Sequence, residues 1–149
     1  MEHAVLMESA ARILVALACG SFVGVERLIA HKTAGMRTYA LAAGGSALFI
    51  VLSQLYSVAN NTNPQYVLGQ IVAGIGFLAA GSIIVSGDKV LGLTTASGIW
   101  FMAAIGATFG YGYYALGLLM TFLLLITLST LLKFENYALR KYSKNKKED

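Results

Sequence analysis

A stretch of 43 residues without a charged side chain, from Val90 to Leu132, constrains this chain most strongly. As a single α-helix it would extend about 65 Å, whereas the hydrocarbon core of a bilayer is about 30 Å thick. The stretch must therefore fold back on itself, and Gly110-Tyr111-Gly112 places two flexible residues at its centre. Tyr113 and Tyr114 follow, and tyrosine is enriched at membrane interfaces. The stretch therefore predicts a transmembrane helical hairpin.

The composition also indicates a membrane protein. Hydrophobic residues make up 57% of the chain and charged residues 12%, whereas a soluble domain has about 25% charged residues. The 149 residues leave room for about five spans and no soluble catalytic domain. The N-terminal segment carries acids where a signal peptide is basic, so we expect the first span to be retained. A single cysteine, Cys19, excludes a disulfide framework within one chain.

The pattern of apolar and polar segments predicts an all-α integral membrane protein with five transmembrane helices. Polar turns are expected at residues 60–64 and 86–89, and a basic loop at residues 26–37. The expected spans are Glu8–Val25, Thr38–Val58, Val67–Val85, Leu93–Gly110 and Gly112–Leu132.

The distribution of basic residues predicts the orientation of these spans. With the N-terminus outside, ten of the 11 Lys and Arg residues lie on the cytoplasmic side, and only Arg12 lies outside. The positive-inside rule therefore favours an outside N-terminus and a cytoplasmic C-terminus. We expect a membrane domain at residues 1–132 and a basic cytoplasmic tail at 133–149. The tail is expected to be solvated or to contact anionic lipid, or alternatively to bind a partner.

Small residues recur at helical spacing along the predicted spans. Ala16, Gly20 and Gly24 form one stripe, and glycines recur along the fourth span. In lipid, such stripes let helix backbones approach closely. We expect a mainly structural role in helix packing for Gly20, Gly24, Gly74, Gly76, Gly81, Gly98 and Trp100.

A set of polar residues is expected near the cytoplasmic ends of the spans. Glu26 contributes nothing to the positive-inside rule, so its place beside Arg27 indicates an ion-pair cluster. This cluster is either a structural lock for the first loop or part of a solute or ion site. Thr94 and Thr95 either cap the fourth helix or help to bind an anion at its N-terminus. The predicted polar cluster consists of Glu26, Arg27, Arg37, Thr38, Asp88, Thr94 and Thr95.

Familiar catalytic and metal-binding patterns are missing from the sequence. It has no P-loop, no nucleophile elbow and no His/Cys metal spacing, and His3 and His31 stand alone. We therefore expect a non-enzymatic protein without a cofactor or nucleic-acid partner, and we leave open whether a metal binds.

Four sequence blocks together resemble the membrane domain of the MgtC/SapB family. They cover roughly Ala16 to Gly110 in the family's order, and the family also has five helices with the N-terminus outside. The blocks are Gly20-x-x-x-Gly24-Val25-Glu26-Arg27, Ala34-Gly35-Met36-Arg37-Thr38, Gly74-Ile75-Gly76-Phe77-Leu78-Ala79-Ala80-Gly81 and Val90-Leu91-Gly92-Leu93-Thr94-Thr95-Ala96-Ser97-Gly98-Ile99-Trp100.

The sequence departs from this family pattern in three places. Tyr66 stands where many relatives have an arginine, and Ala79 replaces a usual glycine. Larger relatives also carry a soluble C-terminal domain, whereas this chain ends in a short basic tail. Functions that reside in that domain are therefore not carried over.

The resemblance implies a multi-pass protein of the bacterial inner membrane, linked to magnesium homeostasis, low-magnesium adaptation and virulence. It further implies regulation of other membrane proteins, such as the ATP synthase or ion-uptake systems. We expect this regulation to act through small-residue helix faces, so that Gly20→Leu or Gly24→Leu would lose partners while the fold is retained. The alternative is a small ion or solute transporter or channel. A homodimer is the expected oligomeric state, because five short helices bury little surface alone.

Overall fold

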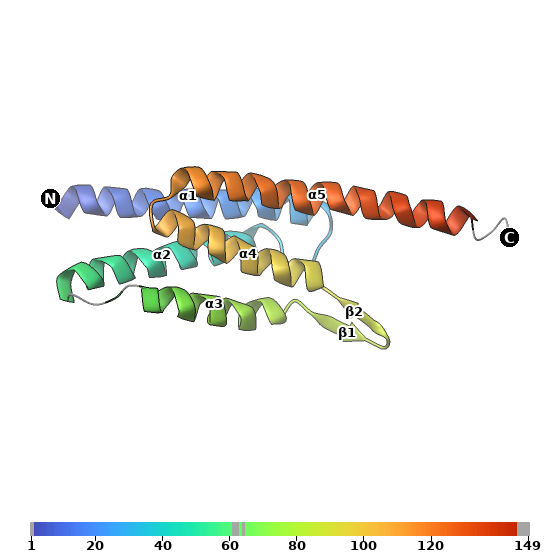
Figure 1. Cartoon of the computed structure of the whole chain (residues 1–149), viewed down its shortest axis with the longest axis horizontal. Coiled ribbons are helices and arrows are strands. Elements are labelled where there is room, and N and C mark those ends of the chain that lie inside the picture. The colour runs from blue at the N-terminus through green and yellow to red at the C-terminus, as the bar shows by residue number, and fades with distance from the viewer. Residues whose placement is uncertain (1, 61–62, 64, 146–149) are drawn as a thin grey trace.

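The computed structural model describes residues 2–60, 63 and 65–145. Five helices and one short β-hairpin make up this part of the chain (Figure 1). In order along the chain, the elements are α1 (Glu2–Ile29), α2 (Met36–Asn60), α3 (Gln65–Ala80), β1 (Ile84–Ser86), β2 (Lys89–Leu91), α4 (Leu93–Gly110) and α5 (Tyr114–Asn145).

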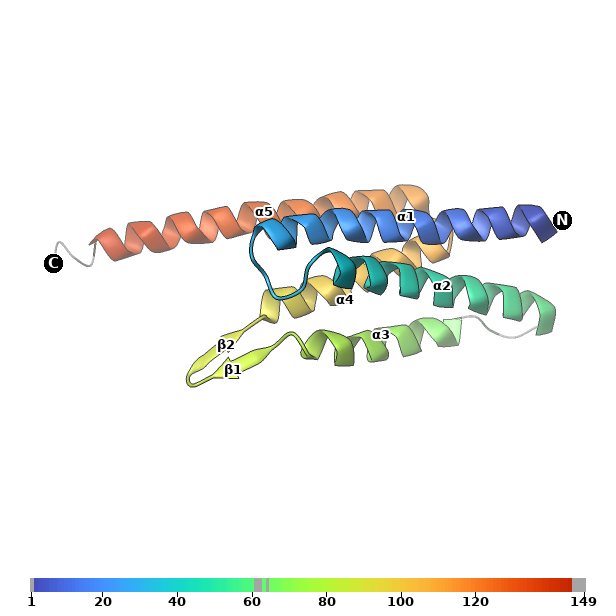
Figure 2. The same cartoon turned by 180° about the vertical axis from the view of Figure 1, so that it is seen from behind.

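The helices form an elongated bundle in which α4 has the central position. It contacts α1, α2, α3 and α5, and 61% of its residues are buried. Figures 1 and 2 show α1 and α5 side by side on one flank and α3 on the other, with α2 and α4 between them. Successive helices run in opposite directions, and α5 extends beyond the bundle. The two ends of the chain therefore lie at opposite ends of the long axis.

Small residues set the close approach of α1, α2 and α4. A Cβ added at Gly20 would lie 2.5 Å from the carbonyl oxygen of Tyr39, and one at Gly110 would lie 2.8 Å from that of Ala47. One at Gly106 would overlap the backbone of Ala43. Because no hydrophobic force drives helices together in lipid, such contacts supply much of the attraction by dispersion.

Four helical segments are long and apolar enough to cross a membrane: His3–Ile29, Met36–Asn60, Leu93–Gly110 and Tyr114–Leu132. Helix α3 is apolar but has only 16 residues. At about 1.5 Å per residue it extends about 24 Å, less than the usual hydrocarbon core. Four spans therefore satisfy length and composition, and the fifth span and the membrane orientation stay predictions.

The predicted third span, Val67–Val85, is wrong at its C-terminal end. Helix α3 stops at Ala80, and the chain then forms an antiparallel hairpin in which Ile84 pairs with Leu91 and Ser86 with Lys89. β-Branched residues favour strands, and Gly87, with φ of +57°, forms the tight turn between them. The apolar side chains of the first strand were mistaken for the end of a span. The fold is therefore helical with one two-stranded exception.

The break between the last two helices lies where the glycines predicted it. Helix α4 ends at Gly110, and Gly112 has φ of +85°, a conformation that glycine adopts readily. Helix α5 then continues past Leu132 to Asn145. The division into a membrane domain and a tail stays a prediction. The tail residues Lys146 and Lys147 lie outside the described residues.

Candidate functional site

Arg27 is the most deeply buried charged residue in the described chain. It lies in the last turn of α1 and is 1% exposed. Its Nη2 donates a hydrogen bond to Oγ1 of Thr95 in α4 at 3.2 Å, and its Nη1 lies 3.7 Å from the carboxylate of Glu26. Its Nε has no hydrogen-bond partner among the described residues. Glu26, Arg27 and Thr95, which were predicted to belong to one polar cluster, therefore lie together.

Tyr39 completes this cluster, although it is not among the residues predicted from the sequence. It is fully buried, and its hydroxyl donates to the carbonyl oxygen of Thr95 at 3.4 Å. Its ring end occupies the space over Gly98, where a Cβ would overlap the hydroxyl. The only available signal was its position directly after Thr38 at the start of α2. Tyr39 and Arg27 therefore join α1, α2 and α4 at one residue, Thr95.

A cavity of about 490 Å³ opens beside Arg27 at the start of α4. Its polar lining comes from Arg27, Lys32, Thr94, Thr95 and Thr127, and the start of α4 at Gly92 also borders it. The remaining lining residues are apolar: Val90, Leu91, Leu93, Leu128, Leu131 and Leu132. We call this space the Arg27 cavity.

The expectation that Thr94 or Thr95 caps α4 is wrong. The N-cap residue is Gly92, with φ of +89°, and no side-chain cap is made to this terminus by the described residues. Both threonines follow the cap and lie in the first turn, where Thr95 instead accepts the hydrogen bond from Arg27. The first N–H groups of α4 are thus left without a side-chain partner at the edge of the Arg27 cavity.

The structure separates Arg37, Thr38 and Asp88 from this cluster. Arg37 and Thr38 line a different space, between α2 and α3. Asp88 is exposed in the turn of the β-hairpin. Thr94 is exposed but lines the Arg27 cavity. The predicted set is therefore divided between one buried cluster, one groove and one surface turn.

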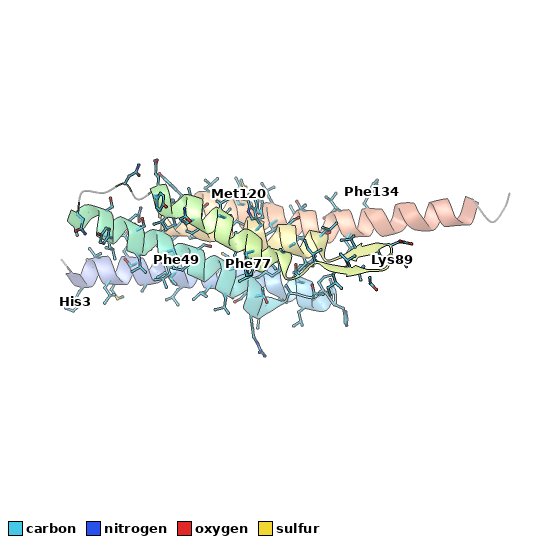
Figure 3. All side chains as sticks on the ribbon, turned by 90° about the horizontal axis from the view of Figure 1, so that it is seen from below. His3, Phe49, Phe77, Lys89, Met120 and Phe134 are labelled. Carbon is cyan, nitrogen blue, oxygen red and sulfur yellow. The ribbon has the colours of Figure 1, made fainter. Side chains whose placement is uncertain are left out.

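The space between α2 and α3 is an apolar groove of about 600 Å³, which we call the α2/α3 groove. Gly45 of α2 and Gly74 of α3 both line it, and neither has a neighbouring atom within 4 Å of an added Cβ. Phe49 also lines it, and Figure 3 shows Phe49 and Phe77 on this side of the molecule. Phe77 is 88% exposed. Large apolar side chains and bare glycines therefore share this surface.

The residues predicted for helix packing occupy three kinds of place. Gly20, Gly24 and Gly98 lie against neighbouring helices, where a Cβ would meet backbone or ring atoms. Around Gly74 and Gly76 the space is empty, and a Cβ at Gly81 would meet only the carbonyl oxygen of Leu78. Trp100 is 44% exposed and lines a cavity of about 240 Å³ between α3 and α4.

A second polar cluster, centred on Arg12, lies at the opposite end of the bundle. Arg12 pairs with Glu8 on α1, as the spacing predicts. Its Nη1 also donates to Oε1 of Gln54 at 2.9 Å and to the carbonyl oxygen of Gly110 at 3.0 Å. The second and third contacts join α1 to the ends of α2 and α4 and were not predicted. Fifteen residues of helix separate Arg12 from Arg27, or about 22 Å.

The described residues contain no group of three or more His, Cys, Asp or Glu side chains placed to hold a metal ion. The acidic residues nearest the clusters, Glu8 and Glu26, lie at opposite ends of α1. The described residues therefore offer no candidate ligand set for a metal ion, and whether a metal binds stays open.

Comparison with known proteins decides which family carries this arrangement. The model of the MgtC family matches residues 13–137, which include the Arg27 cluster and most of α5 and begin directly after Arg12. This chain belongs to the MgtC family. No solved structure gave a significant match to this family member.

Three relatives show the extent of the family likeness. The Escherichia coli protein named "Putative magnesium transporter YhiD" is 39% identical over 140 residues, which are 89% of this chain and 63% of YhiD. Protein MgtC of Brucella abortus is 44% identical over 107 residues, 72% of this chain and 44% of its own length. Protein SrpB of Synechococcus elongatus is 39% identical over 140 residues, covering 85% of this chain and 76% of SrpB. The chain thus spans less than two thirds of the length of YhiD and of MgtC.

In this MgtC-family chain, three of the four sequence blocks that carry the family likeness meet in space. The block ending in Glu26-Arg27 and the block containing Thr94-Thr95 join at the Arg27 cavity. Tyr39 directly follows the block from Ala34 to Thr38, and its hydroxyl donates to the carbonyl oxygen of Thr95. The block from Gly74 to Gly81 stays apart, along α3 and its exposed side. Membership of the family, together with four long apolar helices, makes this a multi-pass membrane protein.

Proposed function

We propose that this chain is a regulatory protein of the bacterial inner membrane that acts in magnesium homeostasis by binding another membrane protein. Its N-terminus lies outside and its C-terminus in the cytoplasm. The link to magnesium is supported by the family and by the name of YhiD. In this proposal the chain is not an enzyme, and its work is done by helix contact.

The observation that carries the proposal is the α2/α3 groove. Gly45 and Gly74 leave bare backbone on both of its walls, in a lining that is mostly apolar. In lipid, exposed glycines are the places where a further helix packs closely against a backbone. Among the described helices, α3 packs mainly against α4 and α2, so its outer side is open to a partner helix.

The surface expected to bind partners is different from the surface that supports this proposal. Gly20 and Gly24 are consumed by the contact between α1 and α2, because a Cβ at Gly24 would lie 2.8 Å from the backbone nitrogen of Met36. Gly24→Leu would therefore disrupt the bundle itself. This contact argues against the expectation that the substitution leaves the fold intact, and Gly74→Leu takes its place as the test.

The chemistry of the helix interiors favours regulation over magnesium transport. Magnesium binds oxygen ligands, principally carboxylates and water. Helices α2, α3 and α4 contain no acidic residue, and α1 has none between Glu8 and Glu26. The buried contacts between the two arginine clusters are made mainly by alanine, glycine and aliphatic side chains. A path of oxygen ligands across the bundle is therefore not supplied by these helices.

Transport is the second candidate function, favoured by the Arg27 cavity and by the name of YhiD. Ion flux into proteoliposomes, measured with magnesium-, potassium- and proton-sensitive dyes, tests it. Flux that changes in Glu26→Gln would establish transport with Glu26 in the mechanism. The absence of ion flux with folded and correctly oriented protein would reject transport.

Photocrosslinking in cells tests the proposed regulation. A photoreactive phenylalanine analogue replaces Phe49, which lines the α2/α3 groove, and in a matched control it replaces Phe122, which is similarly exposed on α5 and does not line the groove. We expect the Phe49 probe to crosslink one membrane protein in low magnesium, such as an ATP synthase subunit or an ion-uptake protein. A crosslink to a second copy would instead identify a homodimer. Equal labelling from both positions, or labelling of lipid alone, would contradict the proposal.

A further inference from the structure

The Arg27 cavity contains a cationic side chain that the protein itself does not neutralise fully. Arg27 is 1% exposed, its Nε has no hydrogen-bond partner among the described residues, and its Nη1 reaches Glu26 only at 3.7 Å. A buried guanidinium with unused donors is costly unless an anion or water binds them. Arg27 is one of the residues that line the cavity, so its side chain lies at the edge of a space that a ligand can enter.

The start of α4 adds backbone donors to the same space. Its N-cap is Gly92, which has no side chain, and no side-chain cap reaches this end of the helix from the described residues. The residues from Gly92 to Thr95 all line the cavity. Uncapped N–H groups and the positive end of the helix dipole favour an anion, and a phosphate group fits both. The hydroxyl of Thr94 is a further donor.

The net charge of the residues that line the cavity is positive, which favours an anion. Arg27 and Lys32 line it, whereas Glu26 lines a separate groove between α1 and α5. The opposite wall is formed by Leu128, Leu131 and Leu132 of α5. A cavity lined by cationic side chains and by leucines suits an amphiphile with an anionic headgroup. The cavity also lies at the end of the bundle where the positive-inside rule places the cytoplasmic surface.

We propose that the Arg27 cavity binds a phosphate group, held by Arg27, Lys32 and the N-terminus of α4. The phosphate belongs either to the headgroup of an anionic phospholipid, with its acyl chains along α5, or to free inorganic phosphate. This site lies away from the α2/α3 groove, so its test is independent of the proposed regulation.

The test uses the full chain purified in a neutral maltoside detergent. In one arm, native mass spectrometry measures retention of phosphatidylglycerol against diacylglycerol, which lacks the phosphate. In the other arm, the unfolding temperature is measured in inorganic phosphate against chloride at equal ionic strength. We expect Arg27→Lys to weaken binding about tenfold, because it removes the planar fork of donors. Lys32→Gln should weaken it about fivefold.

Lys89→Gln is the matched control, because it removes the same charge from the nearby hairpin without touching the cavity. If Arg27→Lys does not fold, Lys32→Gln and Thr94→Val decide, since both side chains are exposed. Selective binding of phosphatidylglycerol identifies a lipid site, and stabilisation by inorganic phosphate alone identifies a free-anion site. Binding of neither, or binding that Lys32→Gln and Thr94→Val leave unchanged, overturns the proposal. Binding that Lys89→Gln weakens equally overturns it as well.

Discussion

Arg27 of α1 donates a hydrogen bond at 3.2 Å to Thr95 of α4, which follows it by 68 residues in the chain. This contact and the hydrogen bond from Tyr39 to the carbonyl oxygen of Thr95 converge on the first turn of α4. Three helices are thereby fixed at the end of the bundle where the Arg27 cavity opens. The packing of α4 and the shape of the Arg27 cavity therefore both depend on Thr95.

Removing the Thr95 hydroxyl tests this dependence. We expect Thr95→Val to lower the free energy of unfolding by about 1–3 kcal/mol, because it leaves buried Arg27 without its hydrogen-bond acceptor. Reversible unfolding in detergent measures the change. Thr94→Val is the matched control, since Thr94 is exposed in the same turn, and it should change stability by less than about 0.5 kcal/mol. Equal stability of the two variants would show that the Arg27–Thr95 contact contributes little.

The glycines of the bundle should separate into two groups on substitution. Gly106→Leu is expected to destabilise the fold by about 3 kcal/mol or more, since its Cβ would overlap the backbone of Ala43. Gly69→Leu should be nearly neutral or slightly stabilising, because the space around it is empty and leucine favours a helix. Thermal unfolding of the two variants measures the difference. A tolerated Gly106→Leu would contradict the close approach of α2 and α4.

Arg12 should stabilise the other end of the bundle. Arg12→Met would remove the bonds to Gln54 and to the carbonyl oxygen of Gly110, at a cost of about 2–3 kcal/mol for charge-assisted bonds. Glu8→Gln removes only the exposed ion pair and should cost less than about 1 kcal/mol. Hydrogen exchange at the end of α4 should increase in Arg12→Met alone. If both variants behave alike, the contacts of Arg12 across the helices are unimportant.

The helices were predictable because charge and hydropathy mark them clearly. The fourth span coincides with α4, and the glycines at its end mark the observed break. The β-hairpin was missed because Ile84 and Val85 extend the apolar run of α3, and hydropathy alone does not distinguish an exposed strand from a helix end. Only the paired register of the two strands, which depends on structure, reveals it.

The candidate site was predicted in its position along the bundle but not in its grouping. Topology placed all the polar residues at one end, yet it does not say which face of a helix each occupies. Arg37 and Tyr39 are two residues apart, or about 200° around a helix. Because Tyr39 faces α4, Arg37 lies on the side of the α2/α3 groove. The phenol of Tyr39 was overlooked because one buried tyrosine in an apolar span carries no distinctive pattern.

Growth in limiting magnesium tests the central claim, that the chain acts in magnesium homeostasis through its α2/α3 groove. A bacterium lacking the gene is complemented with the wild-type chain, with Gly74→Leu in the groove or with Gly69→Leu outside it. The amounts of folded protein in the membrane are first matched. We predict that the wild type and Gly69→Leu restore growth and that Gly74→Leu does not, because its side chain fills the space that a partner helix would enter. Full restoration of growth by Gly74→Leu would contradict the account.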